Sequence, residues 1–221
     1  MLVFHGIGST GRAMEALTGF DQLGDRDGVV VAYPDALNGT WNQAPAIMGS
    51  VPDDVGFING LIDHLANAGC IDRTKVFAAG FSNGGGMTYR LACDSATTLT
   101  AIGLVSTDYL GSSDCKRSAP IAVFALHGKA DTTMPLAGVT YGTSVHPSVL
   151  VWASGWAAAN GCQPTPATRD TSTATRLSWT TRCSGGASVT LTEINRGTHE
   201  WFRGDSDATQ SIWTFLRGQG L

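Results

Sequence analysis

A serine between two glycines is the residue of this chain best placed to act as a nucleophile. Ser82 is the centre of the stretch GFSNG, residues 80–84, directly after the apolar run 75–81. This G-x-S-x-G spacing is typical of a sharp strand-to-helix turn, because side chains two positions before or after the serine would collide with neighbouring backbone. The turn also places the serine at the positive end of a helix. The pattern predicts a nucleophile; the alternative is a tight turn whose serine only caps the helix.

A serine nucleophile needs a general base, and the histidines are the candidates. In a triad on an α/β sheet, the order along the chain is Ser, then Asp or Glu, then His. The five histidines are His5, His64, His127, His146 and His199. The first two precede Ser82, His127 ends an apolar strand as a buried structural imidazole would, and His146 begins a helix. His199, in the loop RGTHEW between the last expected strand and helix, is therefore the predicted base.

The third member of such a triad is an acid that orients the histidine. Asp131 lies in LHGKAD, just past the apolar run 121–127. Loops at the carboxyl ends of strands are where ligands bind in open α/β sheets. Asp131 is the predicted acid, and Asp108, which follows the preceding strand, is the competing candidate.

A second glycine-rich stretch proposes different chemistry. GIGSTG at 6–11 follows an apolar run, and Asp35 comes after the next apolar run, as in a dinucleotide-binding fingerprint. The pair His5-Gly6 instead suits a loop whose backbone N–H groups bind an oxyanion. No tyrosine is followed four positions later by the lysine that small reductases use. A nicotinamide-dependent reductase remains only a remote alternative.

Composition limits the class of protein. The chain has 221 residues, 14% of them charged, which fits one compact domain over 1–221. Its net charge is −4, and no cluster of Lys and Arg exceeds the pair in CKR at 115–117, so no nucleic-acid partner is expected. No run of apolar residues is long enough to cross a membrane, so no membrane partner is expected either.

The cysteines bear on metals and on compartment. There are five and none forms a CxxC pair, which argues against structural zinc, and we expect no metal and no cofactor. Wide cysteine spacing, loops rich in Thr and Ser and few lysines are typical of an exported protein, where disulfides form. Free buried thiols in a cytosolic enzyme are the alternative. No signal peptide follows Met1, which leaves either a leader that is absent from this chain or a cytosolic protein. Because of the cysteine spacing and the loop composition, we expect the first, a secreted protein.

Apolar runs alternate with helix-like stretches, as a mostly parallel sheet with helices on both faces requires. The expected strands are 1–5, 28–34, 75–81, 99–106, 121–127 and 188–195. The expected helices are 53–69, from just after Ser82 to about Cys93, 148–161 and 206–217. Residues 163–187 have little apolar pattern and are interpreted as an irregular excursion or a hairpin between Cys162 and Cys183.

The stretches that carry these features resemble, in order, those of one enzyme family. They are GIGSTGRAM, GVVVAYPDALNGTWN, DDVGFINGLIDHL, FSNGGGM, LHGKAD and GTHEWF. They are similar to secreted feruloyl esterases and polyhydroxybutyrate depolymerase-like esterases of the α/β-hydrolase superfamily, over nearly the whole chain. The resemblance implies a serine hydrolase of carboxylic esters with Ser82, Asp131 and His199 as its triad. It also implies an oxyanion hole formed by the backbone N–H groups of Ile7 and Asn83.

The resemblance also implies how the cysteines pair, and the chain departs from the family's usual pattern in one respect. The implied disulfides are Cys93–Cys115 and Cys162–Cys183, which leaves Cys70 single. Such proteins usually have one or two strands before the His-Gly strand, whereas this chain begins at that strand. We therefore expect the fold without its first N-terminal strands. An exposed edge strand could then pair with another copy, so the expected state is a monomer or an edge-mediated homo-oligomer.

The substrate is the least determined feature. Trp41 and Trp201 lie in loops expected near the site, where aromatic faces could stack on a phenolic acyl group or a polymer repeat. The alternative is that both only close the core. A feruloyl esterase acting on plant cell-wall or other aromatic or polymeric esters is the first expectation. A polyester depolymerase and an acetylxylan esterase are alternatives, and a non-catalytic binding protein on the same fold is a remote one.

Overall fold

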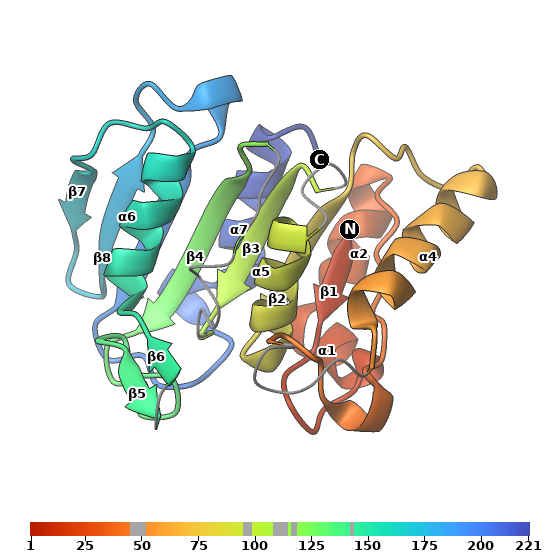
Figure 1. Ribbon diagram of the computed structural model, residues 1–221, viewed down its shortest axis with the longest axis horizontal. Helices are drawn as coiled ribbons and strands as arrows, with labels where there is room; N and C mark the ends of the chain where they lie inside the picture. The colour runs from red at the N-terminus through yellow and green to blue at the C-terminus, as the bar shows by residue number, and fades with distance from the viewer. Residues whose placement is uncertain (45–51, 95–98, 108–114, 116–118, 142–143) are drawn as a thin grey trace.

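A seven-stranded sheet forms the centre of the molecule. The computed structural model describes residues 1–44, 52–94, 99–107, 115, 119–141 and 144–221 (Figure 1). The strand order is β1-β2-β3-β4-β9-β8-β7, parallel from β1 to β9 and antiparallel for β8 and β7. The strands are β1 (Leu2–Phe4), β2 (Phe77–Phe81), β3 (Ala101–Val105), β4 (Ala122–Gly128), β7 (Ala167–Asp170), β8 (Ala174–Trp179) and β9 (Val189–Ile194). This sheet confirms the predicted mostly parallel α/β architecture.

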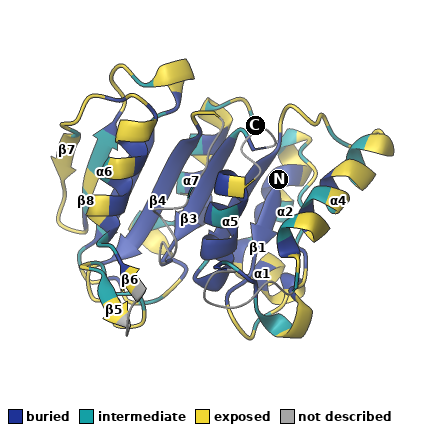
Figure 2. Cartoon of the chain, in the orientation of Figure 1, coloured by how far each residue is buried: buried dark blue, intermediate teal, exposed yellow. Residues whose placement is uncertain are grey.

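The residues of the strands at the centre of the sheet are buried, as Figure 2 shows. Every residue of β4 is buried. Because side chains alternate along a strand, Val123 and Ala125 join the core on one face, and Phe124 and Leu126 join the core on the other. Continuous apolar runs are the pattern expected of parallel strands that helices cover on both sides.

Helices cover both faces of the sheet. The core on one face includes residues from α4 (Asp54–Asn67), α5 (Asn83–Asp94) and α6 (Val149–Ala159). The core on the other includes residues from α1 (Gly11–Thr18), α2 (Phe20–Asp27) and α7 (Ala208–Gly218). In Figure 1, α5 and α6 lie in front of the strands and α7 lies behind them. The smaller elements are η1 (Leu37–Gly39), β5 (Val139–Tyr141), β6 (Ser144–His146), η3 (Ser184–Gly186) and η4 (Gly204–Ser206).

The predicted strand 28–34 is wrong. This segment forms a single bridge, Leu2 to Ala32, beside β1. The backbone N–H of Val3 donates to Ala32 O, and that of Ala32 donates to Met1 O, both at 2.9 Å. Gly28 ends α2 in a left-handed conformation, and Pro34 lacks an N–H, so few residues remain to pair. The outer edge of β1 is nevertheless occupied over these residues by the chain itself.

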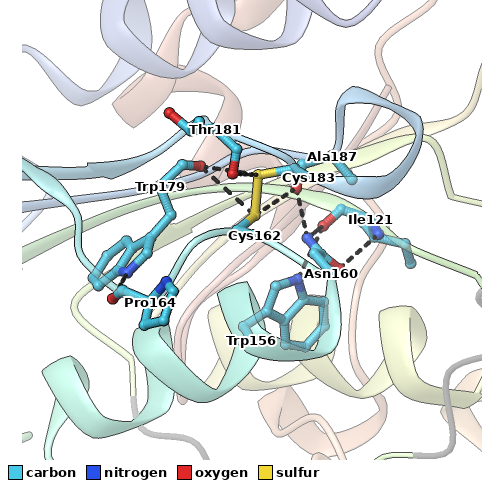
Figure 3. Close-up of a disulfide and its surroundings, with 9 residues drawn as sticks. All are labelled: Ile121, Trp156, Asn160, Cys162, Pro164, Trp179, Thr181, Cys183 and Ala187. Carbon is cyan, nitrogen blue, oxygen red and sulfur yellow. Dashed lines mark hydrogen bonds between the residues drawn. A yellow bond between two sulfur atoms is a disulfide. The ribbon is translucent and has the colours of Figure 1, made fainter.

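The excursion after α6 is a hairpin closed by a disulfide. Strands β7 and β8 pair antiparallel, and Cys162–Cys183 joins the two ends of the segment (Figure 3). Beside it, the Asn160 side-chain amide donates to Ile121 O and Ala187 O, each at 2.8 Å. The disulfide Cys93–Cys115 is also formed, and Cys70 is free and exposed. Both pairings that the family resemblance implies are therefore present.

Candidate active site

Ser82 stands on a strained turn between β2 and α5. Its φ is +54°, a left-handed conformation that residues other than glycine rarely adopt. A Cβ on Gly80 would lie 2.2 Å from Gly84 O, and a Cβ on Gly84 would lie 2.3 Å from Phe4 O. The turn therefore requires glycine at both positions, for the steric reason that the sequence spacing suggested.

One chain of hydrogen bonds joins Ser82, His199 and Asp131. Ser82 Oγ lies 2.9 Å from His199 Nε2, and His199 Nδ1 lies 2.8 Å from Asp131 Oδ2. The three residues follow β2, β9 and β4 respectively. Because these strands are parallel, their carboxyl ends meet at one edge of the sheet. The structure thus brings together the three side chains that sequence order singled out, although they are far apart along the chain.

The surroundings of Asp131 fix the direction of these bonds. Its carboxyl group is buried, and Oδ1 accepts the backbone N–H groups of Thr133 at 2.9 Å and Met134 at 2.8 Å. A carboxylate only accepts, so His199 Nδ1 carries the proton and donates it to Oδ2. Nε2 is then free to accept the Ser82 hydroxyl. The competing acid, Asp108, lies outside the described residues.

His127 holds the loop that carries Asp131. It is buried at the end of β4, and its Nε2–H donates to Met134 O at 2.7 Å. Burial lowers the pKa of His127, which favours the neutral ring, against the opposing effects of Met134 O and Asp131. Its interpretation as a buried structural imidazole is confirmed.

The glycine-rich loop 6–11 runs beside Ser82. A Cβ on Gly6 would lie 3.5 Å from Ser82 Cβ. Within the part of the chain that the structure describes, the backbone N–H groups of Ile7 and Asn83 donate no hydrogen bond. Asn83 is the first residue of α5, where such N–H groups are free to bind an anion. Both predicted oxyanion-hole donors therefore belong to segments that meet at Ser82.

The structure does not support the dinucleotide-binding interpretation of the same loop, because Asp35 is hydrogen-bonded within the fold. Asp35 Oδ1 accepts the backbone N–H of Gly11 at 2.6 Å, at the start of α1. A Cβ on Gly11 would lie 2.1 Å from Tyr33 O, so this glycine is needed for packing. These residues are thus engaged within the fold rather than arranged around a ribose.

The predicted substrate-binding role of two tryptophans is wrong. Trp41 is fully buried, and its indole N–H donates to His5 O at 3.1 Å. Trp201 is 4% exposed, donates to Thr209 Oγ1 at 3.0 Å and packs against Phe20. Neither ring has a free face for a substrate, because each is covered by the protein. Both close the core, as the alternative interpretation held.

The side chain of Asn83 has a structural role that the sequence pattern did not predict. Its amide exchanges two hydrogen bonds with the backbone of Trp41, at 2.8 and 3.0 Å. A polar side chain among glycines, directly after a candidate nucleophile, was the available signal.

Among the residues described, no three His, Cys, Asp and Glu side chains gather in a way that could hold a metal ion. No described helix is long and apolar enough to cross a membrane.

Comparison with known sequences finds relatives among esterases. No established family model matches the sequence. Feruloyl esterase C of Emericella nidulans is 31% identical over 156 residues, an alignment that covers 70% of this chain and 51% of that protein. The chain spans about half, or less, of the length of the curated relatives that it matches.

Solved structures share the fold at low sequence identity. The acetyl xylan esterase from Aspergillus awamori superposes with a TM-score of 0.72 at 14% identity, covering 99% of this chain and 88% of that one. A putative hydrolase of the α/β superfamily from Xanthomonas campestris gives a TM-score of 0.56 at 16% identity, covering 98% and 96%. The fold is therefore that of the α/β-hydrolases.

Proposed function

The chain belongs to the α/β-hydrolase esterases, and on that premise we propose that it is a serine carboxylic ester hydrolase acting through an acyl-enzyme. The observation that carries the proposal is the hydrogen-bond chain from Ser82 through His199 to Asp131. Nucleophile, base and orienting acid have the order and the contacts that acyl transfer needs.

The first half-reaction acylates Ser82. His199 Nε2 takes the hydroxyl proton as Oγ attacks the ester carbonyl carbon. The imidazolium that forms is stabilised by the buried carboxylate of Asp131. The backbone N–H groups of Ile7 and Asn83 bind the oxyanion, whose charge exists only in the tetrahedral species. His199 then gives its proton to the departing alcohol.

The second half-reaction repeats the sequence with water. His199 takes a proton from a water molecule, whose oxygen attacks the acyl carbonyl. Ser82 leaves with the proton that His199 returns, and the carboxylic acid is released. These steps use only the side chains and backbone groups already described, together with water.

We propose an aromatic or polymer-linked ester as the substrate, with feruloyl esters first. The support is the similarity to a feruloyl esterase over 70% of this chain.

Two disulfides support an exported protein, because such bonds persist in oxidising compartments.

A substrate panel tests the proposal. Hydrolysis of methyl ferulate, short p-nitrophenyl esters, acetylated xylan and polyhydroxybutyrate is compared for the unsubstituted protein, Ser82→Ala and Ser178→Ala. Ser178 lies in the hairpin strand β8 and serves as the matched control. We expect methyl ferulate to be cleaved by the unsubstituted protein and by Ser178→Ala, and Ser82→Ala to be inactive. Unchanged hydrolysis by Ser82→Ala would contradict the assignment, and preference for another ester would reassign the substrate alone.

A further inference from the structure

A buried set of hydrogen bonds connects the two segments that carry the proposed oxyanion-hole donors. At one end, the side chain of Asn83 meets the backbone of Trp41. The Trp41 backbone N–H donates to Asn83 Oδ1 at 2.8 Å, and Asn83 Nδ2 donates to Trp41 O at 3.0 Å. This paired contact joins the loop after η1 to the first residue of α5.

The other end of the set is the His5-Gly6 segment. The Trp41 indole N–H donates to His5 O at 3.1 Å. The His5 ring accepts the backbone N–H of Ala36 at Nε2, at 3.1 Å, so Nδ1 carries the proton and donates it to Gly6 O at 2.8 Å. In a trans peptide the C=O and the next N–H point in opposite directions. Holding the Gly6 carbonyl therefore sets the direction of the Ile7 N–H.

Packing leaves the Trp41 ring little freedom. Its side chain is fully buried, and it meets Phe4 of β1 edge to face with ring centres 5.2 Å apart. The His5 ring is 5.3 Å away on centres. Donors and acceptors in such a dry setting are costly to leave unpaired, so they hold one arrangement.

We infer that Trp41 is a positioning residue for the oxyanion hole, and this inference rests on the proposed esterase function. Through its backbone it is fixed to Asn83, and through its indole N–H it is fixed to His5. It thereby sets the separation and the orientation of the Asn83 and Ile7 N–H groups. Its contribution is to the geometry of the tetrahedral intermediate, not to contact with the substrate.

The test removes one hydrogen bond and keeps an aromatic ring. Trp41→Phe deletes the indole N–H that binds His5 O. Trp179→Phe is the matched control, since that buried indole also donates to a backbone carbonyl, Pro164 O at 3.0 Å (Figure 3). Trp179 pairs with Val189 at the start of β9, at the end of the sheet opposite His199.

The readouts separate oxyanion geometry from general stability. They are kcat and KM for p-nitrophenyl acetate, the inhibition constant of a trifluoromethyl ketone that forms a hemiketal with the serine, and the thermal midpoint. For Trp41→Phe we expect kcat, per titrated active site, to fall about tenfold to a hundredfold, as for small misplacements of catalytic groups. The ketone should bind more weakly by a similar factor, with KM within about twofold. Trp179→Phe should change only the thermal midpoint.

Each outcome decides the matter. If Trp41→Phe keeps the kcat and ketone affinity of Trp179→Phe, the positioning role is refuted while the esterase proposal stands. If the unsubstituted protein neither cleaves esters nor binds the ketone, the esterase proposal fails and this inference fails with it. If Trp41→Phe does not fold, 3-benzothienylalanine at position 41 keeps the shape of the indole without its N–H, and the same loss of kcat is expected.

Discussion

Ser82 has an unusual backbone conformation that its two flanking glycines make possible. Its positive φ aims the hydroxyl at His199, while the spaces beside Gly80 and Gly84 are filled by backbone oxygens of the same turn and of β1. Strain of this kind persists only where the surrounding structure enforces it. The turn and its neighbour β1 therefore act as one unit, in which a single methyl group has a large effect.

Gly84→Ala tests that unit. The added Cβ would lie 2.3 Å from Phe4 O, so the helix start or β1 must shift. We expect a loss of about 1–3 kcal/mol of unfolding free energy, as for overpacked cores, together with a fall in kcat. Gly60→Ala, where nothing lies within 4 Å of the added Cβ on α4, is the control, and it should gain about 0.5–1 kcal/mol. Urea unfolding measures both, and equal stability changes would refute the steric account.

Asp131→Asn tests the acid. The amide keeps an oxygen for the N–H groups of Thr133 and Met134 but turns its NH₂ toward His199, which favours the wrong tautomer. We expect kcat to fall by about 10³–10⁴, as when the acid of a serine protease triad is changed this way. Assays with a short p-nitrophenyl ester measure it. More than a tenth of the original kcat in this variant would move the acid to another residue, Asp108 first.

At the scale of elements, a hydrogen bond from the buried imidazole of His127 holds the loop after β4 in place. His127 Nε2 donates to Met134 O and lies 3.6 Å from Asp131 Oδ2, while its buried Nδ1 has no hydrogen-bond partner among the described residues. Protonation would place a charge in this buried position, near His199 as well as Asp131. We therefore expect the geometry of this loop, and with it the placement of Asp131, to depend on pH through His127.

This sensitivity has a definite sign. Burial holds the pKa of folded His127 below its unfolded value of about 6.5. The stability that comes from its neutral state is fully present above that value and is lost as pH falls toward the folded pKa. Urea unfolding at about pH 7.5 and at about pH 5 measures this loss of unfolding free energy. It should be smaller for His127→Gln than for the unsubstituted protein, because glutamine does not titrate. Equal losses in the two proteins would contradict this account.

For the whole molecule, the edges of the sheet bear on assembly. Segment 30–32 covers part of the outer edge of β1, and the opposite edge strand, β7, is short and carries Arg169 and Asp170. Short, charged edge strands resist pairing with another copy. We therefore predict a monomer, to be measured by sedimentation velocity. A dimer that persists at high salt and is broken by a proline in β7 would contradict this prediction. It would instead support a homo-oligomer formed by pairing of edge strands.

The sequence predicted those parts of the molecule that follow from local pattern. The apolar runs at β2, β3, β4 and β9, and the start of the expected helix 53–69, are readable because each depends on near neighbours; Asp53 caps α4 at that start. Helices α1 and α2 were not predicted as separate elements, since each has eight residues and Gly19 both ends the first and begins the second. Such short helices contain too few turns for a periodic pattern.

Some residues of the candidate site could likewise be predicted from the sequence, and others could not. Ser82, Asp131 and His199 were predictable because strand ends on a parallel sheet gather at one edge, in a known order. The burial of Trp41 was not, because its partners His5 and Asn83 are 36 and 42 positions away. No periodicity in a loop reports contacts at that range, so an aromatic residue near a site can be read as facing the substrate when it supports the backbone instead.

The most direct test of the central claim is to find which residue is the activated nucleophile. The protein is treated with a fluorophosphonate, digested and examined by mass spectrometry, beside Ser82→Ala and Ser178→Ala. We predict a single adduct on the peptide containing Ser82 in the unsubstituted protein and in Ser178→Ala, and none in Ser82→Ala, with ester hydrolysis lost in proportion to labelling. Ester hydrolysis that continues with Ser82 unlabelled, or a labelled serine elsewhere that tracks the loss of activity, would contradict the account.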